Sequence, residues 1–415
     1  MFHISEIIII MKASSPPTDE KFKIGMLLSD TRYRGTSLQV ITFIIFVAVF
    51  FWLVDNTLKN LALLGKDVSF NFLFLRAGYD INQRLIPYSS DSTHGRAAVV
   101  GILNTLLVAF VGCVIATILG LFVGILRLSK NWLVAKLMSA YIEGFRNVPV
   151  LLWIVMVFAL LTEFTPAPKA FKGADPQATM LFFDSVAITN RGTYFPAPIL
   201  NEGAYWVIFI FILSVFAVIF LKRYADKLKR ETGKAFPTFL VSIAILIFPS
   251  TILFFALGSP ISLEYPYLKG FNFKDGIHLR NSFLALTLAL ALYTSAFIAE
   301  IVRAGIMAIS KGQTEAASSL GLRPNKIMNL IILPQALRII VPPLISNYLN
   351  LTKNSSLAIA VGYMDVRGTL GGITLNQTGR ELESMLLLMG FYLCVSLLIS
   401  SVINYYNRSF QIVVR

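Results

Sequence analysis

Charged residues are scarce in this chain of 415 residues, at 14% of the sequence, and the acidic ones are the scarcer sign. A soluble globular protein carries about a quarter charged residues. The low charge, together with 56% hydrophobic residues and a mean hydropathy of +0.71, therefore argues against an ordinary soluble protein. Apolar runs of about 20 residues, long enough to cross a hydrocarbon core of about 30 Å, recur along the chain. The composition predicts an all-α integral membrane protein.

Residues that carry redox, metal or nucleophilic chemistry are also rare. The two cysteines, Cys113 and Cys394, both fall inside apolar runs, which predicts buried thiols and argues against a disulfide framework. The three histidines, His3, His94 and His278, are scattered through polar segments. The sequence therefore supports neither a metal site nor a catalytic triad, and we expect a protein that is not an enzyme by itself.

The chain has no G-x-x-x-x-G-K-[ST] loop, the motif that cradles the phosphates of ATP. Gly65-Lys66 and Gly233-Lys234 both lack the upstream glycine and the following hydroxyl residue. We therefore expect no cofactor bound by this chain, and any ATP that drives it must be used by a partner.

The formal net charge of +14 is spread over short segments between the apolar runs. This pattern indicates basic loops on the cytoplasmic side of a membrane, and not a nucleic-acid surface. The segment KRYADKLKRETGK, 222–234, holds six basic residues in thirteen and is the strongest such marker. The tract Ile7–Met11 is too short, and lacks the preceding basic flank, to be a signal peptide.

Eight membrane spans are predicted from the apolar runs. With the first tail inside, the predicted inner segments carry more Lys and Arg than the outer ones, and both termini fall in the cytoplasm. An amphipathic helix at the inner interface is expected over 132–145, just before the third span. The spans are expected at 37–53, 97–126, 150–161, 204–221, 238–257, 282–299, 331–351 and 385–405.

The most informative stretch is a polar, small-residue segment, 310–334, between the sixth and seventh spans. Ser310 followed three residues later by Gln313 predicts a capping box at the start of a short helix. Gly321 predicts a left-handed stop, and Pro324 argues against a helix that restarts at once. Small residues between these marks would let a partner approach the backbone closely.

The string Glu315-Ala316-Ala317, with Gly321 four residues further on and Ile331-x-Leu333-Pro334 after a gap of nine, is a spaced motif. It resembles the EAA signature of permease subunits in importers of the ATP-binding-cassette (ABC) type. The flanking sequences YTSAFIAEIVRAGIMAISKGQ and LPQALRIIVPPLISNYLNLTKNSSL narrow the resemblance to the polar or general L-amino-acid uptake branch, similar to the histidine and glutamine permeases of the binding-protein-dependent transport family.

This resemblance implies a type I importer core with extra spans, in the bacterial inner membrane. It implies a second, related permease subunit, two cytoplasmic ATP-binding subunits, a periplasmic substrate-binding protein and an amino-acid substrate. The helix 310–321 would couple to the ATPase, and Pro334 would start the next span. The coupling residues that the resemblance implies are Glu315, Ala316, Ala317, Gly321, Ile331, Leu333 and Pro334. The chain then divides into a cytoplasmic tail (1–36), a first span with its periplasmic loop (37–96), the first part of the core (97–162), an insertion with two extra spans and periplasmic loops (163–280), the second part of the core (281–407) and a cytoplasmic tail (408–415).

Three ionisable residues fall inside a predicted span or at its end, and charge within the membrane is costly and is a functional candidate by default. Glu300 and Arg303 lie at positions i and i+3 near the inner end of the sixth span, and can neutralise each other. They are interpreted equally as a structural brace or as a gate. Arg338, one or two turns into the seventh span, is expected to have a carbonyl or carboxylate partner.

Pro342-Pro343 is predicted to interrupt the seventh span and free backbone carbonyls at mid-membrane. Polar residues near this break and on neighbouring spans are candidates for a path that carries a zwitterion. Hydrogen bonding between spans is an equally good interpretation of the same residues. The candidates are Asn104, Thr105, Thr294, Ser295, Asn347, Asn350 and Lys353.

Two other classes of function stay open at this point. An ion-coupled secondary amino-acid transporter would need a buried carboxylate at mid-span, but Glu300 lies near one end, and no inverted repeat is visible. A membrane scaffold without transport would leave the spaced motif unexplained. Dependence of uptake on ATP separates the first alternative from an ABC importer, and loss of solute flux on deletion separates both from a scaffold.

Overall fold

The computed structural model describes residues 31–173, 175–233 and 236–410. Most of the predicted N-terminal tail, the tract Ile7–Met11, His3, Lys234 and the last five residues of the C-terminal tail lie outside this part of the chain. The chain divides into two units, Met1–Phe70 and Asn71–Arg415, and each is described by itself.

The first unit contains one long helix, α2 (Thr31–Leu63), where a span at 37–53 was predicted. The helix continues beyond the predicted end of the span to Leu63, and in this extension Lys59 Nζ lies 2.6 Å from Asp55 Oδ2, one turn earlier. None of the described side chains of α2 from residue 33 onward is buried. A helix that exposes apolar residues on every side is suited to lipid.

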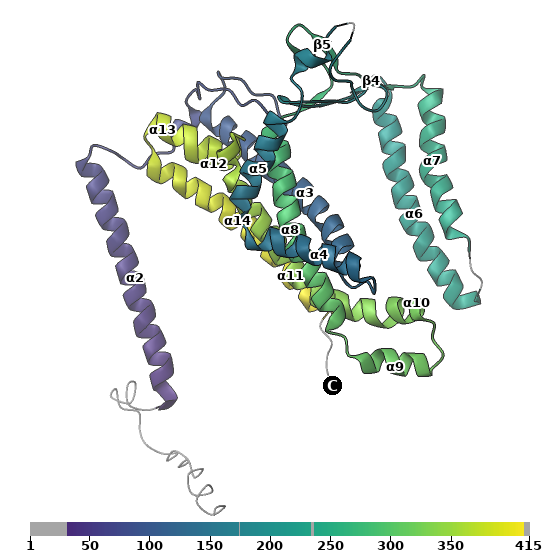
Figure 1. Ribbon diagram of the computed structural model, residues 1–415. Coiled ribbons are helices and arrows are strands. Elements are labelled where there is room, and N and C mark those ends of the chain that lie inside the picture. Colours follow the sequence, from purple (N-terminus) through teal and green to yellow (C-terminus); the bar gives the residue numbers. More distant parts are fainter. Residues whose placement is uncertain (1–30, 174, 234–235, 411–415) are drawn as a thin grey trace, which may run out of the picture. The chain divides into compact units, whose positions relative to one another are not determined.

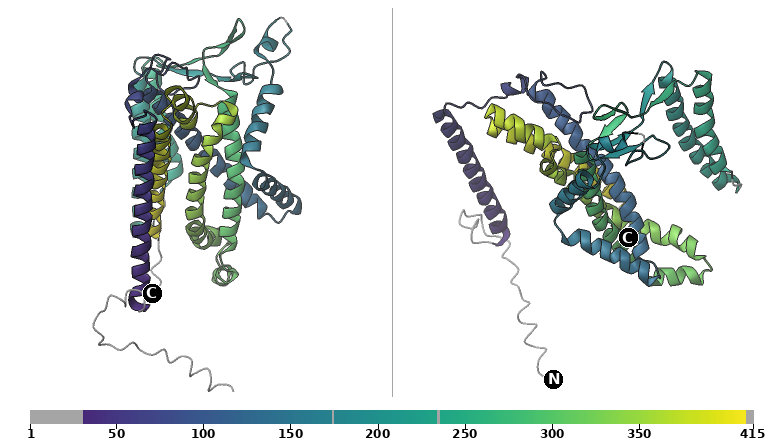
Figure 2. Two further views of the ribbon diagram at one scale, coloured as in Figure 1. Left: turned by 90° about the vertical axis from the view of Figure 1, so that its left-hand side faces the viewer. Right: turned by 45° about the horizontal axis from the view of Figure 1, so that its top comes forward.

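The second unit is built mainly from helices (Figures 1 and 2). Across the described residues of the whole chain, seven helices are long and apolar enough to cross a membrane, or eight if the bent pair α4–α5 is one span. The fold class expected from the sequence is thereby confirmed. The helices are α3 (His94–Arg127), α4 (Trp132–Asn147), α5 (Val150–Glu163), α6 (Ala204–Thr232), α7 (Thr238–Ala256), α8 (Asn281–Met307), α9 (Lys311–Ser319), α10 (Pro324–Ile327), α11 (Leu333–Asn354), α12 (Val366–Gly368), α13 (Leu375–Thr378) and α14 (Glu381–Phe410).

Short stretches of tighter or wider helix join several of these elements. They are the 3₁₀ turns η1 (Asn71–Phe74), η2 (Pro168–Phe171) and η4 (Ser355–Val361), and the π-helical segments η3 (Met328–Ile332) and η5 (Thr369–Thr374).

The third predicted span corresponds to α5, which is only 14 residues long. At 1.5 Å per residue it covers about 21 Å, which is less than a hydrocarbon core. It follows α4 across a bend of 106° at Pro149. The structure therefore gives one bent pair here, with α4 meeting α5 almost at a right angle.

Helix α8 is the centre of the core, and 67% of its most apolar stretch is buried. It packs against α3, α4, α5 and α11. Glycines on α3 allow the closest approach, since a Cβ atom on Gly120 would lie 2.6 Å from the side chain of Ile298 and one on Gly124 would lie 2.8 Å from the carbonyl oxygen of Ala299. Small residues at such positions are how membrane helices gain van der Waals contact.

The segments 164–203 and 257–280, which we call the strand lobe, were predicted as loops but contain seven short strands. They form a three-stranded sheet in the order β1-β2-β7 and two hairpins, β3-β4 and β5-β6, all antiparallel. Strands of three or four residues are too short to show an alternating pattern in sequence. Their bounds are β1 (Ala187–Thr189), β2 (Gly192–Phe195), β3 (Ala197–Leu200), β4 (Ile261–Glu264), β5 (Tyr267–Lys269), β6 (Asn272–Lys274) and β7 (Ile277–Leu279).

Helix α6 is longer than predicted, because the basic segment expected to connect two spans continues the helix as far as Thr232. Gly233, at φ +69°, then ends it in a left-handed conformation. Lys and Arg are good helix formers, so their charge marks the end of the membrane and not the end of the helix.

Two proline predictions were wrong. Helix α11 continues through Pro342-Pro343, whereas a break was expected. Packing against α8 holds α11 in a helical conformation near the two prolines, because Ile340 is buried and its side chain lies against Gly305 of α8. Pro324 starts α10 instead of preventing it, since proline is tolerated at the first helical position, where its missing N–H has no partner to lose.

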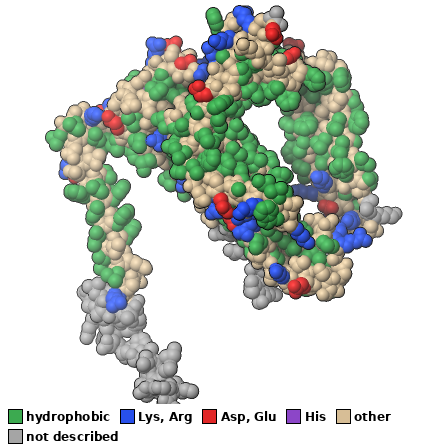
Figure 3. All heavy atoms as spheres, in the orientation of Figure 1, with side chains coloured by type: hydrophobic (Ala, Val, Ile, Leu, Met, Phe, Trp, Pro, Cys, Tyr) green, Lys and Arg blue, Asp and Glu red, His purple; other side chains and the backbone are tan. Residues whose placement is uncertain are grey.

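Apolar side chains cover the outside of the helices, and the charges gather near their ends (Figure 3). Cys394 is exposed and Cys113 half-buried, and both are free thiols. The prediction that both cysteines are core residues is therefore wrong for Cys394. An apolar run does not distinguish the lipid-facing side of a membrane helix from its packed side.

Candidate functional site

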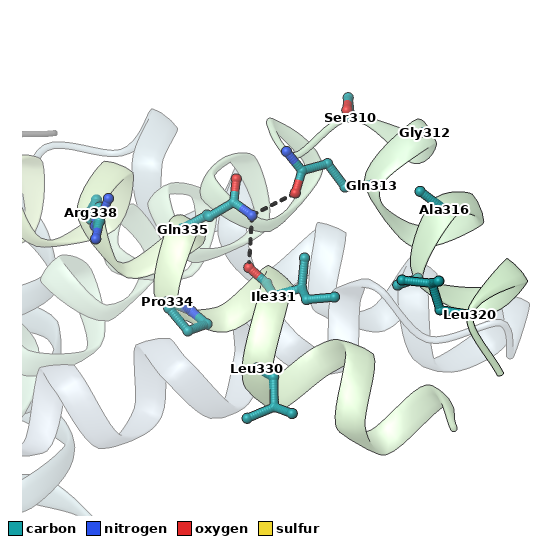
Figure 4. Close-up of a pocket in the computed structure, with 11 residues that line it drawn as sticks. Ser310, Gly312, Gln313, Ala316, Leu320, Leu330, Ile331, Pro334, Gln335 and Arg338 are labelled. Atoms are coloured by element: carbon teal, nitrogen blue, oxygen red, sulfur yellow. Dashed lines mark hydrogen bonds between the residues drawn. The ribbon is translucent and has the colours of Figure 1, made fainter. Parts of the chain in front are cut away.

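The predicted coupling segment forms α9, which lies between the end of α8 and the turn into α10. Ser310 occupies the N-cap position with an extended backbone, but its side chain makes no capping hydrogen bond. The predicted capping box is therefore not formed. Gln313 instead accepts a hydrogen bond from Nε2 of Gln335, at 2.7 Å, and Gln335 also donates to the carbonyl oxygen of Ile331 (Figure 4). This bond ties α9 to the first turn of α11.

The exposed face of α9 carries Glu315 and Ala316, whereas Ala317 is buried with 3% exposure. Ala317 was expected to face a partner, and the structure places it inside the chain instead, where its small side chain lets α9 sit close to its own neighbours. The hydroxyl groups of Ser318 and Ser319 donate to the carbonyl oxygens one turn back, at 2.8 and 3.0 Å. All of α9 except Ala317 is therefore exposed and open to a partner, and the two serine hydroxyls on it are bonded within the helix.

Gly321 ends α9 with φ +77°, as predicted from sequence. Its N–H donates to Ser318 O at 2.9 Å, and the N–H of Leu322 donates to Ala317 O at 3.3 Å. This pair of bonds is a Schellman motif, which needs a residue in the left-handed region at this point. A Cβ atom at Gly321 would meet nothing within 4 Å, so only the backbone conformation restricts the residue here.

A groove of about 670 Å³ lies between α9 and the η3–α11 segment (Figure 4). Leu333 and Pro334 are the first two residues of α11, and both are exposed. Arg338 lines the groove and is exposed, and no described residue supplies the carbonyl or carboxylate partner that was expected for it. The groove is lined by Ser310, Gly312, Gln313, Ala316, Ala317, Leu320, Leu330, Ile331, Pro334, Gln335 and Arg338.

The pair Glu300–Arg303 forms as predicted, with Arg303 Nε 3.3 Å from Glu300 Oε2. The structure adds Arg127, from the last turn of α3, whose guanidinium binds the same carboxylate. Nε of Arg127 also donates to Ser139 Oγ on α4, at 3.2 Å. Sequence reasoning missed Arg127 because 173 positions separate it from Glu300. The signal available in the sequence was the position of Arg127, an arginine directly after a predicted span that contains no charge.

Four of the seven polar path candidates come together in one cavity. Thr294 on α8 and Asn347, Asn350 and Lys353 on α11 line a cavity of about 260 Å³. Its other lining residues are Tyr293, Phe297 and Asn354. Asn350 and Lys353 are exposed, so the cavity is open on the side of α11.

The other three candidates lie elsewhere and are engaged in bonds within the chain. Asn104 Nδ2 donates to the carbonyl oxygens of Gln83 and Met364, at 2.8 and 2.9 Å. Thr105 Oγ1 accepts from the N–H of Val366, at 3.0 Å. Ser295 is bonded to Tyr141, with their oxygens 2.7 Å apart. For these three the structure favours a role in holding the fold together.

One buried carboxylate was not singled out from sequence. Asp365 lies between the last two spans, is fully buried, and caps α12 by accepting from the N–H of Gly368 at 2.8 Å. Its other oxygen, Oδ2, has no hydrogen-bond partner among the described residues. Burial raises the pKa of Asp365 to about 7, against the opposing effect of the Gly368 N–H. An acidic residue in a loop gives no sign in sequence that it will be buried.

The long apolar helices and the polar helix α9 at the end of two of them describe a polytopic membrane subunit that moves solutes with the help of a partner. Comparison with protein families supports this class. Residues 231–411 match the family model described as binding-protein-dependent transport system inner membrane component.

Full-length relatives extend the match to the whole chain. The chain is 52% identical, over 97% of its length and 99% of the relative's, to the glutamate/glutamine/aspartate/asparagine transport system permease protein of Rhodobacter capsulatus. It is 43% identical, over 93% and 94%, to the general L-amino acid transport system permease protein of Rhizobium johnstonii. It is 42% identical, over 95% and 98%, to a putative amino-acid ABC transporter permease protein of Escherichia coli.

The chain therefore belongs to the family of binding-protein-dependent transport system inner membrane components. It is a multi-pass membrane permease subunit, a transporter component and not an enzyme by itself, and it works together with other components of an ABC transporter. The comparisons give no support to the alternative of a secondary transporter.

Proposed function

We propose that this chain is the permease subunit of an ATP-driven importer of amino acids in a bacterial inner membrane, with both termini in the cytoplasm. The relatives' names support the substrate class. The complex would contain a second, related permease, two cytoplasmic ATP-binding subunits and a periplasmic substrate-binding protein. This chain would bind no cofactor, and ATP would be used by the partner subunits.

The observation that carries the proposal is the place of α9. Glu315 and Ala316 are exposed on α9, and its first turn is tied to α11 by the Gln313–Gln335 bond. A cytoplasmic ATPase that holds α9 would pull on α8 and α11 together, because α9 lies between them in the chain and contacts the η3 segment. In this mechanism Glu315 binds the ATPase by hydrogen bonds or a basic residue, and Gly321 keeps the angle between α9 and α10.

The cavity between α8 and α11 is the proposed place for the amino acid. A zwitterion needs donors for its carboxylate and acceptors for its ammonium group. Lys353 Nζ supplies a cationic donor, and the amide oxygens of Asn347 and Asn350 supply acceptors. Because the cavity is open on the α11 side, the second permease subunit would supply the remaining wall. The Glu300–Arg127–Arg303 cluster would brace or gate the end of this pathway that lies nearer α9.

The proposal is tested by comparing Gly321→Val with Gly144→Val, on α4 and outside the coupling segment, in the full transporter, reconstituted in vesicles with its ATPase and binding protein. Both sites have open space for a side chain, but only Gly321 has a positive φ. A β-branched residue in the left-handed region costs about 1–2 kcal/mol, which is a factor of about 5–30 in the ratio of native to non-native turn. We expect ATP-dependent amino-acid uptake, and ATPase co-purification, to fall for Gly321→Val and to change little for Gly144→Val.

Two results would contradict the proposal. Uptake that needs an ion gradient and no ATP would restore the secondary-transporter alternative. An intact complex with unchanged uptake in Gly321→Val would remove the coupling role from α9.

A further inference from the structure

The far end of α6 carries a dense group of cations that neither the proposed pathway nor the coupling helix uses. Helix α6 leaves the strand lobe after β3 and packs only on α7 among the neighbours with which it shares substantial contact (Figures 1 and 2). Its last eleven residues, 222–232, are the helical part of the basic segment noted in the sequence. Five of them are Lys or Arg: Lys222, Arg223, Lys227, Lys229 and Arg230.

Helix geometry places these cations at one depth. The apolar part of α6, 204–221, is 18 residues long and covers about 27 Å, which matches a hydrocarbon core of about 30 Å. The cations from Lys222 to Arg230 therefore lie within about 12 Å of the core boundary, in the layer where phospholipid headgroups sit. This layer is on the side opposite the strand lobe, because α6 leads away from the lobe.

The cations also share one face of the helix. Successive residues turn by about 100°, so the five basic side chains fall within an arc of about 160°. Asp226 lies in the same arc, so this face carries five cations and one carboxylate. The other side carries Ala225, which is buried, and Leu228, which is half-buried. Basic residues spaced for solubility alone would be distributed around the helix, and these are not.

Three of the cations have no acidic partner within the described chain. Lys227 pairs loosely with Glu231, at 3.8 Å, and Arg230 Nε donates to the carbonyl oxygen of Asp226 at 3.2 Å. The exposed side chains of Lys222, Arg223 and Lys229 make no ion pair or hydrogen bond with any described residue. A compact group of unpaired cations at headgroup depth is electrostatically complementary to anionic lipid.

We propose that the basic end of α6 binds the phosphate headgroups of anionic phospholipids and so anchors the α6–α7 hairpin at the membrane surface. Lys222, Arg223 and Lys229 make the contacts, and Lys227 and Arg230 add to the local potential. The hairpin gains from such an anchor because most of its other exposed surface is apolar.

The test measures how strongly the purified full-length chain, in lipid nanodiscs, retains spin-labelled phosphatidylglycerol relative to spin-labelled phosphatidylcholine. Each cation near an anionic surface contributes about five-fold in affinity. We expect the triple variant Lys222→Gln/Arg223→Gln/Lys229→Gln to lose selectivity for phosphatidylglycerol by a factor on the order of 100. Glu231→Gln removes the carboxylate that pairs with Lys227, and should raise selectivity about five-fold.

The matched control neutralises three exposed lysines of the strand lobe, Lys169, Lys172 and Lys274, and should leave selectivity unchanged. Equal retention of both lipids by the native chain, or unchanged selectivity in the triple variant, would overturn the proposal. Displacement of the lipid by an equal concentration of inorganic phosphate would identify a free-anion site instead. Loss of ATPase co-purification with unchanged lipid selectivity would identify the cations as a protein-docking surface. If the triple variant does not fold, Glu231→Gln provides the test: a rise in phosphatidylglycerol selectivity supports the proposal, and unchanged selectivity overturns it.

Discussion

Replacement of Glu300 by Gln tests whether the charged cluster at the α9 end of the core is a brace. The carboxylate of Glu300 binds Arg127 from α3 and Arg303 from its own helix. The substitution keeps the size of the side chain but leaves two guanidinium groups facing each other. The three side chains are 19–28% exposed, so the site is neither fully buried nor at the surface.

The expected cost follows from that intermediate burial. Breaking a buried ion pair by removing one partner costs about 3–5 kcal/mol, whereas exposed pairs contribute about 0–1 kcal/mol. For side chains with about a quarter of their surface exposed, we expect a loss of about 2 kcal/mol in the free energy of unfolding. This corresponds to a factor of about 30 in the unfolding equilibrium.

The assay is a double-mutant cycle on the purified complex, with Glu300→Gln, Arg127→Gln and the double variant compared by thermal unfolding. A brace predicts that the double variant is less destabilised than the sum of the single variants, by about 1–2 kcal/mol. Additive effects would refute the brace between α3 and α8. A gate predicts a different signature, namely ATP hydrolysis or leak of amino acid without the binding protein, at unchanged thermal stability.

Three further predictions concern packing, titration and the pathway. Gly120→Leu should destabilise the chain by about 1–3 kcal/mol because it forces α3 from α8, while Gly144→Leu, at an open site, should not; equal thermal stability of the two variants would contradict the packing. Asp365 has a pKa raised to about 7 in the fold against about 3.9 unfolded, so its contribution to stability is complete below pH 4 and is lost as the pH rises to 7 and above. Thermal unfolding from pH 5 to 8 should therefore show a decline in the native chain that Asp365→Asn lacks, and parallel curves would exclude titration of this group. Lys353→Ala should lower amino-acid uptake at least ten-fold without changing complex assembly, and unaltered uptake of every amino acid would remove the cavity from the pathway.

Features that depend on local order could be predicted from the sequence. The spaced motif from Glu315 to Pro334 is a pattern of residue types at set intervals, and the family match agrees with it. The left-handed turn at Gly321 follows because glycine adopts that conformation without steric cost. The long apolar runs predicted membrane helices because the thickness of the bilayer sets their length.

Partners across the fold could not be predicted in this way. Arg127 and Glu300 are 173 positions apart, and only the packing of α3 on α8 brings the charges together. Ala317 faces inward although its neighbour Ala316 is exposed, because α9 packs on α10 and η3. The same reason applies to Pro342-Pro343, where contact between Ile340 and Gly305 holds a helix that local preference would break.

The sequence by itself determined what this protein is, because two features depend only on the order of residues. These are the apolar runs, whose length matches the thickness of a bilayer, and the spacing of the signature motif. The tertiary structure alone decided which side chains meet. It joined Thr294 to Asn347 and Lys353 in one cavity, left Asn104 and Ser295 to hold helices together, and buried Asp365 in a loop. Burial and contact depend on the faces that helices present to one another, and in a membrane an apolar side chain can face either lipid or a neighbouring helix.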